Sequence, residues 1–152
     1  MQYLGYNYRI TDIQCALAIS QMDKIDLFLD ARKSMAKFYD QAFTEVPNIT
    51  PLQAHGRDNS SHHIYVVSID FDRIGLTRHQ FMTRLAEKGV GSQVHYIPVV
   101  SQPYYQDMGY EIKQYPQTGV YYQNTLSIPL YYGLSSAEQK LVISSIKDLL
   151  EK

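Results

Sequence analysis

Residues 5–29 read GYNYRITDIQCALAISQMDKIDLFL, a polar and aromatic stretch that leads directly into an apolar helical pattern. Thr11 and Gln14 have the spacing of a capping box, in which each side chain binds the backbone N–H of the other residue. Asp12 favours the first turn of a helix because the helix dipole is positive there. Apolar residues then recur every three or four positions, at Cys15, Ile19, Met22, Ile25 and Leu29.

This pattern predicts one long helix that begins at Thr11 and ends before Pro47, with room for a kink near Asp30. Residues 15–19, CALAI, are apolar on every side, so this part of the helix should be buried on several sides. Cys15 within it is expected to be a core residue. Because the helix is long for so small a domain, we expect it to reach another part of a larger assembly.

The rest of the chain predicts an α/β domain. Residues 47–61, rich in proline and turn formers, predict a loop, and residues 98–115 predict irregular, tyrosine-rich structure with one short helix. Short strands are expected over residues 63–70, 92–96 and 125–129, and helices over 77–88, 117–123 and from 135 or 136 onward. The last helix should bury Leu141, Ile143, Ile146 and Leu149 or Leu150. Three short strands with helices on one face form a two-layer sandwich.

The composition narrows the function classes. The chain has 152 residues, 45% of them hydrophobic, which is enough for one globular core. A net charge of −1 gives no electrostatic reason to expect nucleic acid or an anionic membrane as partner. The single cysteine cannot form an internal disulfide, and neither a membrane-length apolar run nor a signal peptide is present. We therefore expect a soluble, cytoplasmic chain.

Asn7 and Arg9 form the first candidate site, because they stand between tyrosines just before a helix N-terminus. The unpaired N–H groups and the dipole of a helix N-terminus favour anions, and an arginine can grip a carboxylate or phosphate with two hydrogen bonds. An asparagine turn followed by a surface arginine explains the same spacing. Both interpretations stay open on the residues alone.

His95, in the stretch VHYIP, is the second candidate, although a lone histidine on a strand is more often structural. The remaining histidines, His55, His62, His63 and His79, lack zinc-ligand spacing, so no metal site is expected. The chain has no phosphate-binding glycine loop and no nucleophile-elbow motif. Its lysines lie among other charges, unlike a lysine that forms a Schiff base. The residues indicate a binding half-site and no complete catalytic set.

Three stretches of the chain resemble one enzyme family. Residues 5–32 resemble the G-x-N-x-R block and following helix of the DegT/DnrJ/StrS-type sugar aminotransferases. Residues 89–99, GVGSQVHYIPV, followed by QPYY, resemble the H-Y-x-P loop of the family, and residues 126–139, LSIPLYYGLSSAEQ, resemble its last strand. The blocks occur in family order. Their tyrosine-rich sequence is most similar to that of the transaminases of pseudaminic acid biosynthesis. This subfamily aminates a UDP-linked 4-keto sugar with glutamate as donor.

The resemblance implies a C-terminal small α/β domain of the aspartate-aminotransferase fold (fold type I), which uses pyridoxal 5'-phosphate (PLP). Residues 1–46 would be an interface segment and long helix, and residues 47–152 the small domain with a short, mainly antiparallel sheet. The lysine that carries PLP belongs to the N-terminal domain of the family and has no counterpart among these residues. We therefore expect this chain alone to be inactive and to supply no catalytic residue.

The resemblance also implies roles for five residues. Asn7 would bind the phosphate of the PLP held by a neighbouring subunit of a homodimer. Tyr8 and Arg9 would lie at the substrate, with Arg9 on the carboxylate of glutamate or on a substrate phosphate. His95 and Tyr96 would line the pocket for the UDP-sugar. The alternative is a stand-alone interaction or dimerisation domain derived from the same family.

Overall fold

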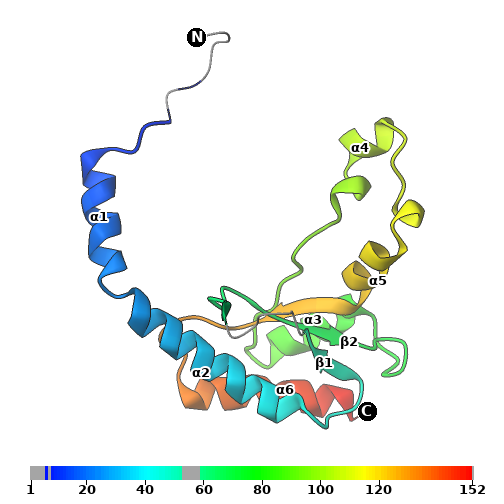
Figure 1. The fold of residues 1–152 in the computed structure, drawn as a ribbon. Helices are drawn as coiled ribbons and strands as arrows, with labels where there is room; N and C mark the ends of the chain where they lie inside the picture. The colour runs from blue at the N-terminus through cyan, green and yellow to red at the C-terminus, as the bar shows by residue number, and fades with distance from the viewer. Residues whose placement is uncertain (1–5, 7, 53–58, 152) are drawn as a thin grey trace.

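The computed structural model describes residues 6, 8–52 and 59–151 (Figure 1). Two short 3-10 turns, Val99–Ser101 and Ile112–Gln114, flank α4 (Pro103–Asp107). The strands of these ranges are β1 (Ile49–Pro51), β2 (Tyr65–Ile69) and β3 (Thr125–Ile128). The α-helices are α1 (Asp12–Met22), α2 (Ile25–Phe43), α3 (Arg78–Glu87), α4 (Pro103–Asp107), α5 (Pro116–Asn124) and α6 (Ser136–Leu150).

The strands form an antiparallel sheet in the order β1-β2-β3, with Ile49 opposite Ile69 and Tyr65 opposite Ile128. Alternate residues of β2 are buried, which is the pattern of a strand with one face on a core. Helices α2 and α6 pack together below the sheet, whereas α1 and the segment containing α4 and α5 rise on the other side (Figure 1). The expected small antiparallel sheet in an α/β chain is confirmed.

The predicted single long helix is wrong, because two helices meet at Asp23 and Lys24. The backbone of Lys24, with φ −108° and ψ 5°, leaves helical geometry, and α2 then runs unbroken through Asp30, where the kink was expected. The predicted burial of residues 15–19 is also wrong for this chain. Helix α1 buries none of its residues, and Cys15 is only half-buried. Nothing else in the described chain packs closely enough on α1 to cover it.

Two strand predictions and one burial prediction need correction. β1 lies in the segment predicted as loop, because Ile49 is an apolar residue that pairs with β2 despite the prolines around it. Residues 92–96 do not form a strand, since only Gln93 exchanges backbone hydrogen bonds with Ser127. In α6, Leu141 is exposed and its neighbour Val142 is buried instead, whereas the burial predicted for Ile143, Ile146, Leu149 and Leu150 is confirmed.

The core lies between the sheet and helices α2, α3 and α6. The Tyr39 ring is fully buried between Phe43 and Tyr65, and its hydroxyl donates to the backbone oxygen of Pro129 at 2.8 Å. The Tyr65 hydroxyl donates to Asp40 Oδ1 at 2.6 Å. These bonds tie α2 to β2 and to the end of β3. No helix in the described ranges is long and apolar enough to cross a membrane.

Burial, and to a smaller extent the nearby Tyr131, raises the pKa of Tyr39 above the ordinary value of 10.0. The unfolded chain therefore ionises Tyr39 first, so the stability that this residue contributes is full below pH 10 and falls as the pH rises further. Above pH 10 the free energy of unfolding should fall less steeply with pH in Tyr39→Phe than in the parent protein. The difference in slope should reach up to about 1.4 kcal/mol per pH unit. Urea unfolding between pH 8 and 11 gives the free energy of unfolding at each pH. Identical slopes of this free energy against pH for the two proteins would contradict this account.

Candidate functional site

His95 is the sequence-predicted site residue that the structure places in a defined environment. Its Nδ1 lies 2.6 Å from Ser127 Oγ in β3, and its ring meets the Tyr96 ring edge to face at 4.6 Å between centroids. The imidazole is half-buried. The other ring nitrogen, Nε2, makes no hydrogen bond to any described residue. His95 is thus held at one nitrogen and keeps the other for a ligand.

A cavity of about 280 Å³ opens beside His95. Its lining combines apolar side chains with several polar groups, as is common in small-molecule sites. Ser92 Oγ is buried in the cavity wall and, among the described residues, has no hydrogen-bond partner. The lining includes His63, Ile64, Ser92, His95, Ser127 and Leu130.

Tyr96, the neighbouring candidate, is 74% exposed and does not line this cavity. Its ring packs on His95, so it lies at the rim of the site. Ser92 and Ser127 are residues of this site that were not predicted from the sequence. Ser127 could have been suspected from its position between Leu126 and Ile128, where a small polar residue interrupts an apolar strand.

The other candidates lie at the opposite end of the chain. Asn7 lies outside the described residues. Tyr8 and Arg9 are exposed, and the Tyr8 ring lies 5.7 Å from that of Tyr6. They precede the N-terminus of α1, which has the predicted capping box between Thr11 and Gln14. Figure 1 shows this segment at the outer end of α1, away from the sheet, whose strand β3 contacts His95 through Ser127. One copy of the chain does not bring the two groups together.

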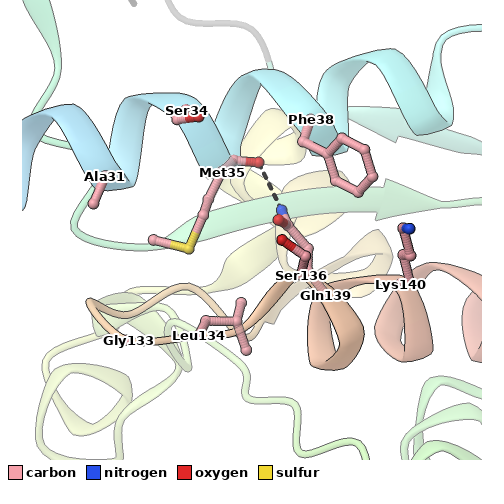
Figure 2. Close-up of a pocket in the computed structure, with 9 residues that line it drawn as sticks. All are labelled: Ala31, Ser34, Met35, Phe38, Gly133, Leu134, Ser136, Gln139 and Lys140. Carbon is pink, nitrogen blue, oxygen red and sulfur yellow. Dashed lines mark hydrogen bonds between the residues drawn. The ribbon is translucent and has the colours of Figure 1, made fainter.

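A second, larger cavity of about 510 Å³ lies between α2 and the start of α6 (Figure 2). Met35 and Phe38 border it from α2, and Gln139 and Lys140 from α6. Gln139 spans the two helices by donating from Nε2 to the Met35 backbone oxygen at 2.8 Å. None of the predicted site residues lines this cavity, and it shares no lining residue with the cavity beside His95.

The described residues hold no group of three metal-ligating side chains. Every described lysine except the half-buried Lys147 is exposed, and Lys88 and Lys113 form ion pairs with Asp148 and Glu111. Desolvation is what makes a lysine nucleophilic enough for a Schiff base at neutral pH. None of the described lysines is therefore fully removed from water.

Comparison with known proteins finds the same family that the three stretches of sequence resemble. The sequence profile of the DegT/DnrJ/EryC1/StrS aminotransferase family matches residues 1–147. Over 152 residues the chain is 33% identical to the UDP-4-amino-4,6-dideoxy-N-acetyl-beta-L-altrosamine transaminase of Campylobacter jejuni, covering all of this chain and 40% of the relative. It is 33% identical to the spore coat polysaccharide biosynthesis protein SpsC of Bacillus subtilis, covering 97% of this chain and 38% of the relative.

Solved structures agree with these matches. Helicobacter pylori PseC, an aminotransferase of pseudoaminic acid biosynthesis, superposes with a TM-score of 0.87 at 26% identity, over 99% of this chain and 40% of PseC. The candidate sugar aminotransferase Spr1654 of Streptococcus pneumoniae, solved in apo, PLP and PMP (pyridoxamine phosphate) forms, gives 0.84 at 30% identity, over 94% of this chain and 36% of Spr1654. The chain spans about 40% of the length of its relatives. It belongs to the DegT/DnrJ/EryC1/StrS aminotransferase family.

Proposed function

We propose that this chain is part of a PLP-dependent aminotransferase that moves an amino group from glutamate to a 4-keto-6-deoxy nucleotide sugar. The match to the family over residues 1–147 is the main support. The similarity to an altrosamine transaminase, over all of this chain and 40% of the relative, favours a UDP-sugar as the acceptor. In this proposal the chain is the C-terminal small domain of the fold, with residues 1–46 as the interface segment and residues 47–152 as the domain itself.

PLP supplies the electron sink for amino-group transfer when it is bound. The lysine that carries it would come from the part of the enzyme outside this sequence, because no described lysine lies in a desolvated site. This chain would contribute contacts only. Asn7 would bind the cofactor phosphate, and Arg9, next to the unpaired N–H groups of α1, would bind the carboxylate of glutamate or a substrate phosphate.

His95 and Tyr96 would contact the nucleotide sugar at the cavity beside β3. The polar groups of that cavity, chiefly His95 Nε2 and Ser92 Oγ, suit the hydroxyl, carbonyl and phosphate oxygens of such a substrate. Because the segment around Tyr8 and Arg9 lies away from this cavity, a complete site needs a second chain. We therefore infer a homodimer with shared active sites, in which each chain supplies Asn7, Tyr8 and Arg9 to its neighbour.

A non-catalytic interaction or dimerisation domain is the second candidate function. The exposed apolar surface of α1 favours it, since such a helix needs a partner whether or not catalysis takes place. The two functions differ in one requirement. The aminotransferase needs a lysine-bearing domain, in the same or another chain, and the interaction domain does not.

Asn7→Ala in the family-length protein tests the cofactor assignment. Removing a hydrogen bond to a charged phosphate costs about 1.5–3 kcal/mol, so the dissociation constant of PLP should rise about 10- to 100-fold. The melting temperature of the cofactor-free protein should stay the same. Equilibrium dialysis with PLP measures the first, and calorimetry the second. The exposed Asn59 provides the control, Asn59→Ala, which should bind PLP normally. Unchanged PLP affinity in Asn7→Ala would refute the assignment.

A further inference from the structure

Ser127 is held in β3 by neighbouring backbone on both sides of the strand. It pairs with Val66 of β2 on one side of β3. On the other side its N–H donates to the Gln93 oxygen at 2.7 Å, and its oxygen accepts from the Gln93 N–H at 3.1 Å. The residue is 6% exposed. Pairing on both sides of the strand therefore sets the position of the Ser127 hydroxyl.

That hydroxyl bonds to one nitrogen of His95. Ser127 Oγ lies 2.6 Å from Nδ1, and among the described residues no other hydrogen bond of this hydroxyl is found. A hydroxyl has a proton to donate, and burying it without an acceptor is unfavourable. The proton is satisfied only if Nδ1 is unprotonated, because Nδ1 then accepts it. In the other neutral tautomer Nδ1 carries a proton. Either two protons would then lie between Nδ1 and Oγ, or the hydroxyl proton would turn away and lack a partner.

We propose that Ser127 is a positioning residue, which holds His95 in the tautomer protonated at Nε2. Nε2–H then faces the ligand as a donor of fixed direction, suited to an oxygen acceptor such as a carbonyl, hydroxyl or phosphate oxygen. That this ligand is a nucleotide sugar rests on the proposed function. The hydrogen bond between Ser127 and His95 does not depend on the proposed function, since both groups belong to the described chain.

Imidazole NMR of the family-length protein, labelled with ¹⁵N-histidine, tests which ring nitrogen of His95 carries the proton. His95→Gln assigns the signals, and a pH near 8 keeps an ordinary imidazole neutral. We expect an unprotonated Nδ1 and a protonated Nε2 in the parent protein. Ser127→Ala should move both shifts toward a mixture of tautomers, whereas Ser127→Thr, which keeps the hydroxyl, should preserve the parent pattern. Ser92→Ala removes a hydroxyl from the same cavity without touching His95, so its His95 signals should not change.

Binding of UDP-N-acetylglucosamine, a stable stand-in for the substrate, tests the consequence by calorimetry. Ser127→Ala should weaken binding about three- to tenfold, the effect of one misdirected hydrogen bond, and Ser127→Thr should restore it. Ser144→Ala, which removes an exposed hydroxyl on α6, is the control for binding. A protonated Nδ1 in the parent protein, or unchanged His95 signals in Ser127→Ala, would overturn the proposal. Tautomer shifts as expected, with parent-like binding in His95→Gln, would instead overturn the nucleotide-sugar assignment of His95.

Discussion

Leu17→Asp is expected to dissociate the dimer that we propose for the family-length protein. Leu17 lies in α1 and is 64% exposed in the isolated chain. Ile13 and Leu17 lie on one side of this helix, and Cys15, Ile19 and Met22 on the other. A helix that is apolar all round belongs in the interior of a protein or assembly. An isolated helix of 11 residues is also marginal in water, so α1 needs a partner to be stable.

Burying an unpaired carboxylate in such an interface costs about 3–5 kcal/mol, which raises the dimer dissociation constant about 10²- to 10³-fold. Sedimentation velocity over a dilution series measures this shift. Leu141→Asp is the matched control, because Leu141 is also an exposed leucine but lies on the outer face of α6. It should leave the dimer intact. If Leu17→Asp dimerises as tightly as the parent protein, α1 does not contribute to the subunit interface.

Tyr39→Ala is expected to be the most destabilising single change in this chain, by about 3–5 kcal/mol. The fully buried ring stacks on Phe43 at 6.0 Å and contacts Tyr65 at 4.9 Å between centroids. Its removal leaves a cavity where α2, β2 and the end of β3 meet. The Pro129 oxygen also loses the hydroxyl that donates to it.

Chemical unfolding followed by circular dichroism gives the free energy for this variant. Phe38→Ala is the control, because Phe38 precedes Tyr39 on the same helix but is 37% exposed. It should cost less than half as much, since much of its ring already meets water. Equal losses for the two variants would show that Tyr39 does not lie in the core.

The sequence predicted the elements with strong local signals and missed those that depend on distant partners. Capping boxes at Thr11, Thr77 and Ser135 begin α1, α3 and α6 in the structure. β1 was missed because only its pairing with β2 makes residues 49–51 a strand. The strand expected at residues 92–96 shrinks to one bridge, because alternation in the sequence does not show where pairing stops.

The candidate site was predictable in its residue types and unpredictable in its neighbours. His95 was a candidate from its place in VHYIP, and the resemblance of its loop to a family block added a role at the substrate. The structure gives it a cavity and a buried hydroxyl. Ser127 stayed hidden, because 32 positions separate the two residues and only the bridge between Gln93 and Ser127 brings them together. The burial predicted for residues 15–19 failed because no other described element covers α1, and a sequence pattern does not show which elements pack together.

Half-reactions of the family-length protein test the central claim, that this chain is part of a nucleotide-sugar aminotransferase, most directly. The PLP-loaded protein is given glutamate alone, and then a UDP-linked 4-keto-6-deoxy sugar. We predict that the first step converts bound PLP to PMP and releases one 2-oxoglutarate per site. The second step should restore PLP and yield the 4-amino sugar, which mass spectrometry identifies. PLP that stays unchanged with glutamate, or PMP that the keto sugar cannot convert back, would contradict the account.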